Sequence, residues 1–178
     1  MANLPSYFNG EAYWKGGSGN LSSDFIVGYY YDSSEEVGYV FGGPTASDQV
    51  YFGATGLDKI GINPPDTSAG GTLSGSMSCS GIEFSGNASF TLDGSIKDSG
   101  YAEFGGAGES VSLTIDKSGS LTAGFGLLDQ NSAITVDGGR LTVNNGFYVG
   151  LVVTFVPKVP FWKLRNFNAL RPTCATTH

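Results

Sequence analysis

Apolar and polar residues alternate with a period of two along most of the chain, and residues 71–94 show this pattern most clearly. In this stretch, GTLSGSMSCSGIEFSGNASFTLDG, apolar residues and glycine alternate with serine, threonine and other polar residues. Because successive side chains of a β-strand point to opposite faces, the alternation predicts half-buried strands. We interpret residues 72–92 as an amphipathic hairpin that turns at Ser80-Gly81, with one face on the core and the other in water.

The same alternation predicts further strands, at 24–31, at 37–41, at 49–53 and within the very apolar segment 146–156, which we expect to be central. Three segments share an apolar-Thr-apolar-Asp pattern followed by a glycine turn: 90–94, 113–119 and 134–138. Aspartate and glycine in this order favour tight turns, so each segment predicts a hairpin. The segments recur at spacings of 23 and 21 residues, which we interpret as a meander of similar hairpins.

Together these elements predict an all-β domain over residues 1–156, either a single antiparallel β-barrel or a two-sheet β-sandwich of about 8–12 short strands. Residues 157–178 differ in composition, because they are basic and bounded by prolines. For this C-terminal tail we predict a short helix or partial disorder. Glycine, at 28 of 178 residues, exceeds its usual share of about 7% more than twofold, as expected for short strands joined by tight turns.

Charge is distributed unevenly along the chain. The formal net charge is −7, all 16 carboxylates precede residue 138, and four of the nine basic residues lie in the tail. An acidic body repels phosphate backbones, so nucleic acid is not expected as a partner. The tail combines basic and aromatic side chains that are candidates for contact with a membrane surface: Phe161, Trp162, Lys163 and Arg165.

Few residues offer catalytic chemistry. The single histidine is His178, the last residue, which argues against a histidine-based triad or a zinc site. Cys79 shares the parity of its apolar neighbours, so we expect a buried thiol. The sequence leaves open whether Cys79 forms a disulfide with Cys174. We therefore predict no catalytic residue, no metal site and no cofactor. A Tyr101–Glu103 pair inside a barrel mouth is the remaining acid–base alternative.

The function that these features favour is non-catalytic binding of a lipid, a membrane surface, a glycan or a protein partner, with the oligomeric state left open. Exposed aromatic side chains next to amides and hydroxyls suit such recognition. Three alternatives remain: a lectin, a pore-forming protein that inserts the 72–92 hairpin, and a barrel isomerase or cyclase with an enclosed apolar pocket. The candidate ligand-binding residues are Tyr13, Trp14, Tyr29, Tyr31 and Tyr101.

Residues 112–126, SLTIDKSGSLTAGFG, place an alternating strand, an aspartate-led turn and a second alternating strand before a glycine pair, Gly138-Gly139. In this the chain resembles the virulence-associated (Vap) proteins of intracellular actinobacterial pathogens. The resemblance implies a compact eight-stranded antiparallel barrel without a catalytic site, and a host-facing role connected with membranes or lipids. The sequence shows neither a secretion signal nor a run of 18 apolar residues, so we expect a cytoplasmic protein, or an extracellular one if a signal has been removed.

Overall fold

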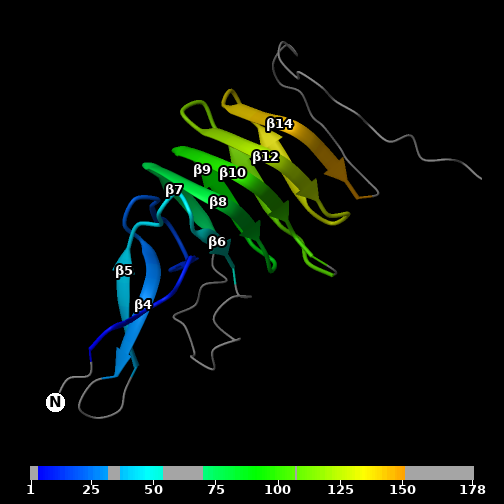
Figure 1. The fold of residues 1–178 in the computed structure, drawn as a ribbon. Helices are drawn as coiled ribbons and strands as arrows, with labels where there is room; N and C mark the ends of the chain where they lie inside the picture. The colour runs from blue at the N-terminus through cyan, green and yellow to red at the C-terminus, as the bar shows by residue number, and fades with distance from the viewer. Residues whose placement is uncertain (1–3, 32–36, 54–69, 107, 151–178) are drawn as a thin grey trace, which may run out of the picture.

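The computed structural model describes residues 4–31, 37–53, 70–106 and 108–150, and within these ranges the chain forms strands and turns without a helix (Figure 1). The all-β class predicted from the alternation is therefore confirmed. The strands are β1 (Ser6–Tyr7), β2 (Glu11–Trp14), β3 (Gly19–Asn20), β4 (Phe25–Tyr31), β5 (Val37–Gly42), β6 (Gln49–Phe52), β7 (Gly71–Ser74), β8 (Ser76–Phe84), β9 (Ser89–Leu92), β10 (Ser95–Phe104), β11 (Ser112–Ile115), β12 (Ser120–Leu128), β13 (Ala133–Val136) and β14 (Arg140–Val149).

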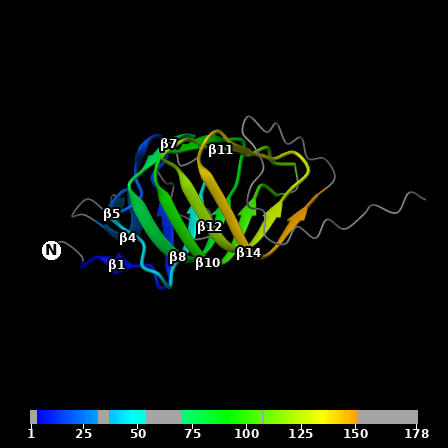
Figure 2. The same ribbon diagram turned by 90° about the horizontal axis from the view of Figure 1, so that it is seen from above.

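The strands form two sheets, named A and B here. Sheet A has nine strands in the order β1-β4-β2-β6-β8-β10-β12-β14, with β5 paired to β4, and sheet B has five in the order β13-β11-β9-β7-β3. From β7 onward the chain alternates between the sheets, so each coil adds one short strand to sheet B and one long strand to sheet A. Figures 1 and 2 show β8, β10, β12 and β14 as arrows that run side by side in one direction. The architecture is a parallel β-solenoid of stacked coils.

The predicted antiparallel barrel or sandwich is wrong, because the aspartate–glycine segments do not fold the chain back on itself. Each of them instead leads the chain from a strand of sheet B into a strand of sheet A, and the next coil lies on top in parallel register. The backbone N–H of Asp93, for example, donates to the carbonyl of Leu73 in the preceding coil at 2.9 Å. The spacings of 23 and 21 residues are the lengths of successive coils, since Phe90, Leu113 and Ile134 are register partners.

The predicted hairpin over residues 72–92 is also wrong. Its first limb is interrupted at Gly75, which has φ +76° and connects β7 of sheet B to β8 of sheet A. A Cβ at Gly75 would lie only 2.3 Å from Oδ1 of Asn20, so glycine is required there by both its backbone and its surroundings. Ser80-Gly81 is not a turn. The pair lies inside β8, where the register with β10 shifts and the strand bends.

The first part of the described chain is less regular than the coils. β4 and β5 form an antiparallel hairpin, and β4 also pairs with β1 and β2 in antiparallel register. β2 then joins β6 in parallel, and β6 joins β8, so the hairpin is connected to one end of the solenoid through sheet A.

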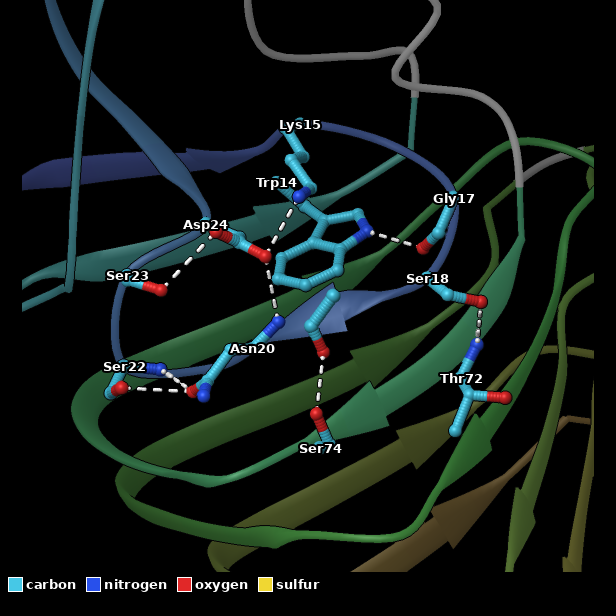
Figure 3. Close-up of polar contacts among 11 residues, drawn as sticks. Trp14, Lys15, Gly17, Ser18, Asn20, Ser22, Ser23, Asp24, Thr72 and Ser74 are labelled. Atoms are coloured by element: carbon cyan, nitrogen blue, oxygen red, sulfur yellow. Dashed lines mark hydrogen bonds and ion pairs between the residues drawn. The ribbon is translucent and has the colours of Figure 1, made fainter.

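A polar corner around Trp14 fixes this junction (Figure 3). The indole Nε1 of Trp14 donates to the carbonyl of Gly17 at 3.1 Å, and Lys15 forms an ion pair with Asp24 at 2.7 Å. Asp24 also accepts a hydrogen bond from the backbone N–H of Asn20 at 2.8 Å. β3, which follows this corner, pairs with β7 of sheet B, so the first coil is held at both sheets.

The interior between the sheets is filled by columns of apolar side chains, one from each coil. Phe52, Phe84 and Phe104 stack in sheet A with ring centroids 4.4 and 5.1 Å apart and ring planes within 10° of parallel. Phe90 of sheet B meets Phe84 edge-on, at 5.4 Å, so the aromatic contacts also join the two sheets. The predicted parity is confirmed here, because Phe84 is fully buried whereas Glu83 is half-buried.

One carboxylate is buried in this apolar interior. Asp98 is 3% exposed at the bend of β10; its Oδ1 accepts a hydrogen bond from the N–H of Gly100 at 2.9 Å, and its Oδ2 has no hydrogen-bond partner among the described residues. Burial raises the pKa of Asp98 above the ordinary value of 3.8. Its register partner is Cys79, whose predicted burial is confirmed at 1% exposure.

Several predictions concern residues outside the described ranges: the tail at 157–178 with Phe161, Trp162, Lys163 and Arg165, and the second cysteine, Cys174. The expectation of a central strand within 146–156 is wrong for its described part, because β14 is the last strand in the order of sheet A. Within the described ranges no helix has the length and apolar character that crossing a bilayer requires.

Truncating the ring at the centre of the stack should destabilise the fold strongly. We expect Phe84→Ala to lower the free energy of unfolding by about 3–5 kcal/mol, because it leaves a cavity between two aromatic neighbours. Urea denaturation followed by circular dichroism measures the change. Phe41→Ala is the control, because Phe41 is 53% exposed on β5 and should cost less than about 0.5 kcal/mol. Equal losses in the two variants would contradict the assigned core.

The buried carboxylate should make stability depend on pH. The folded-state pKa of Asp98 is raised above its ordinary value of 3.8. Below pH 3.8 the carboxyl group is protonated in both the folded and the unfolded state and does not lower stability. As the pH rises through the folded-state pKa, ionisation of the buried group destabilises the fold. Asp98→Asn should therefore gain stability relative to the wild type between about pH 4 and 7, measured as the difference in unfolding free energy at each pH. Asp137→Asn, at an exposed corner, controls for the loss of one negative charge. A parallel trend in both variants would contradict the role of burial.

Candidate functional site

The outward side of sheet A beyond the bend carries exposed aromatic side chains next to carboxylates. The register shifts near Ser80, Ser99, Gly124 and Asn144 lie at the same level in successive coils, so the strands bend together. After the bend, two outward columns run across six strands. We name this surface the distal face; it consists of Glu11, Tyr13, Gln49, Tyr51, Gly81, Glu83, Tyr101, Glu103, Phe125, Leu127, Gly146 and Tyr148.

Three aromatic side chains of the distal face are open to solvent. Tyr101 is 41% exposed, Phe125 39% and Tyr148 50%. Tyr101 and Phe125 are register partners on β10 and β12, and the next position in their column is Gly146 on β14. A Cβ at Gly146 would lie 3.8 Å from the Tyr148 ring and 4.0 Å from the Phe125 ring, so both rings lie beside this glycine. The three strands thus present adjacent aromatic rings at the surface.

Carboxylates lie beside these rings. Glu83 and Glu103 are register partners on β8 and β10, and neighbouring strands are about 4.8 Å apart. Burial raises the pKa of Glu103, and the negative charges of Glu83, Asp129 and Glu109 raise it further. Like charges directly opposite each other on neighbouring strands tend to destabilise a sheet.

The other end of the distal face is covered. Tyr13 is 5% exposed: its ring stacks on Tyr51 at 5.0 Å and meets Phe8 edge-on at 5.2 Å. Its hydroxyl donates to Glu11 at 2.6 Å, and burial followed by this carboxylate raises the Tyr13 pKa. These rings stabilise the junction with the N-terminal hairpin. The accessible part of the distal face therefore extends from Glu83 to Tyr148.

The five candidate ligand-binding residues from the sequence do not form one site. Trp14 is fully buried and Tyr13 nearly so, which excludes both from direct contact with a ligand. Tyr29 and Tyr31 lie on β4 with their rings 5.8 Å apart, in the N-terminal hairpin. Tyr101 alone lies in the accessible part of the distal face.

Sequence analysis missed Phe125 and Tyr148, which join Tyr101 only through the parallel register. A signal was present at the bends: Gly124 breaks the alternation in β12, and Gly100 and Asn145 interrupt the apolar residues of β10 and β14 without changing their parity. Aligning the strands on these breaks places Tyr101, Phe125 and Gly146 in one column. An antiparallel arrangement scatters them.

The described residues include few side chains that could act as a nucleophile or bind a metal ion. Burial, and then the charge of Asp98, raises the pKa of Cys79 to about 12, so its thiolate is scarce at neutral pH. Within the same ranges no group of three or more His, Cys, Asp or Glu side chains is placed to hold a metal ion. Tyr101 and Glu103 do point to the same side, as their parity predicted, but they face outward and not into a barrel mouth.

An open cleft of about 350 Å³ lies at the opposite end of the same strands. Its lining includes the side chains of Ser76, Ser78 and Ser95 before the bend, together with Lys97 and Pro44. The cleft offers hydroxyls and one ammonium group without an aromatic ring. Its chemistry is therefore unlike that of the distal face.

We compared the chain with protein-family models, with curated proteins and with solved structures, and none of the three comparisons finds a match. Any function must therefore be argued from the site itself.

Proposed function

We propose that this protein is a non-catalytic binding protein that recognises a glycan on the distal face. The observation that carries the proposal is the set of three exposed aromatic side chains, Tyr101, Phe125 and Tyr148, on adjacent strands of a rigid sheet. Aromatic rings held at a surface offer flat apolar area at a low cost in conformational entropy, which suits stacking on sugar rings. The neighbouring carboxylates supply hydrogen-bond acceptors for hydroxyl groups.

The chemistry of the distal face favours a glycan over the other partners considered. An anionic membrane surface is disfavoured, because Glu83 and Glu103 lie among the exposed rings and would be repelled. A pore built from residues 72–92 loses its basis, since these residues belong to two different sheets and no hairpin forms. An isomerase or cyclase would need an enclosed pocket, whereas the space between the sheets is occupied by the apolar core.

A glycan-binding role also fits the expectation of a host-facing or environment-facing protein, because polysaccharides are abundant at such surfaces. The likeness to the virulence-associated proteins stays a prediction, and so does the cellular location.

Removing an exposed ring should weaken glycan binding without unfolding the protein. A glycan array of neutral, acidic and amino sugars first identifies a ligand. We then expect Tyr101→Ala to weaken its affinity about two- to tenfold in calorimetric titration, the range that corresponds to the loss of one aromatic contact. Tyr101→Phe should retain binding because it keeps the ring.

Tyr31→Ala is the matched control, since Tyr31 is equally exposed but lies in the N-terminal hairpin. Thermal unfolding of each variant establishes that the fold is intact. An array without any bound glycan, or equal losses for Tyr31→Ala and Tyr101→Ala, would refute the proposed function.

A further inference from the structure

Gly146 of β14 is a glycine that the described fold does not require. Glycine is needed where φ is positive or where a Cβ would meet a neighbouring atom. Within the described ranges, every other glycine has a positive φ or an atom within 3.4 Å of the position that a Cβ would take. The φ of Gly146 is not positive, and the nearest described atoms, in the Tyr148 and Phe125 rings, lie 3.8 and 4.0 Å from its Cβ position. A side chain would therefore fit there.

The other positions in the same outward column show the contrast. Gly81 on β8 also lacks a side chain, but a Cβ there would clash with Oε1 of Gln49, which occupies the space. Tyr101 and Phe125, between the two glycines, fill their positions with exposed rings. Gly146 is the position in this column where no described side chain takes up the space.

A glycine inside a strand costs stability, and it often marks a point where a ligand comes close to the backbone. Gly146 lies in the accessible part of the distal face, beside the exposed rings of Phe125 and Tyr148. Because it has no Cβ, a ligand atom can come closer to the backbone here than at the ring-bearing positions around it. The group that enters must be small, since the space is that of one missing side chain, and apolar, since aromatic rings flank it.

We infer that Gly146 receives the acetamido methyl group of an N-acetylated amino sugar, while the sugar ring itself stacks on Phe125. This inference rests on the proposed glycan-binding function and names its ligand class. The methyl of an N-acetyl group is small and apolar, and it is three bonds away from the sugar ring, so it can approach the strand while the ring stays on the aromatic side chain. The methyl of a 6-deoxy sugar is attached directly to the ring and lacks this reach.

The test compares two neutral hexamers that share a β-1,4-linked backbone and differ in one substituent. The N-acetylglucosamine hexamer carries acetamido groups where the glucose hexamer, cellohexaose, carries hydroxyl groups. Both are titrated into the full chain by calorimetry. We expect the N-acetylated hexamer to bind about threefold to tenfold more tightly, the gain that corresponds to burying one methyl group.

Filling the position should remove this preference. We expect Gly146→Val to weaken binding of the N-acetylated hexamer to about the affinity of cellohexaose, and to change the affinity of cellohexaose less than about twofold. Ser78→Val is the matched control, because it places the same side chain at an exposed position of sheet A before the bend. It should leave both affinities unchanged.

Gly146→Ala separates a role in binding from a role in folding. The added methyl group makes only ordinary van der Waals contacts, so the thermal midpoint should stay the same or rise, whereas the preference for the N-acetylated hexamer should shrink. A clearly lower thermal midpoint would show that the fold needs glycine at this position, and it would overturn the inference.

The other outcomes are equally decisive. Equal binding of the two hexamers, or a preference for the N-acetylated one that survives Gly146→Val, overturns the subsite and leaves the proposed function standing. Selective binding of fucosylated glycans that is lost in Gly146→Val assigns the position to a 6-deoxy methyl group and overturns the N-acetyl assignment. Failure of every glycan on the array to bind overturns the proposed function itself.

Discussion

The in-register stacking of each coil on the one before it is the constraint on which the rest of the structure depends. Parallel pairing places residues of successive coils directly beside one another, as with Phe84, Phe104 and Leu128 across three strands of sheet A. Inside the solenoid this is favourable, because identical or similar apolar side chains stack and exclude water. The backbone hydrogen bonds of the interior strands are then satisfied by their neighbours on both sides, and the core repeats from coil to coil.

The same constraint creates the surface. In-register pairing that aligns the inward side chains of successive strands also aligns their outward side chains. The outward side chains therefore form columns as well, whether or not their contacts are favourable. Tyr101 beside Phe125 is one result, and Glu83 beside Glu103 is another. The first gathers aromatic area that no single strand could offer. The second places two carboxylates on neighbouring strands, an arrangement that tends to cost stability.

How much of this was predictable from the sequence follows from what alternation encodes. The period of two correctly separated inward from outward residues. The burial of Leu73, Cys79, Ile82 and Phe84 could therefore be predicted from the sequence. Alternation does not encode the direction of the neighbouring strand, because parallel and antiparallel strands alternate alike. The repeat was further hidden by unequal coils: the partners Ser76, Ser95, Ser120 and Arg140 are 19, 25 and 20 residues apart.

The candidate site was less predictable than the fold class for the same reason. Tyr101 could be identified as an outward aromatic residue from one strand alone. Phe125 and Tyr148 become its neighbours only when the coils are stacked, and Trp14 and Tyr13 become buried only when the N-terminal hairpin meets the solenoid. A site made from columns depends on register, which is a tertiary property.

The shared bend explains why the two halves of sheet A differ in chemistry. The register shifts by one residue at the bend between successive strands. The inward positions on either side of the bend are three residues apart in β8 and β12, and four residues apart in β10 and β14. Because the bends at Ser99-Gly100, Gly124 and Asn144-Asn145 coincide, the sheet keeps its apolar interior on both sides of them. The outward columns before and after the bend are then free to vary independently. Lys97 and the serines occupy the first half, and the rings and carboxylates occupy the second. The division at the bend gives the described part of sheet A an outer surface whose chemistry changes along its strands.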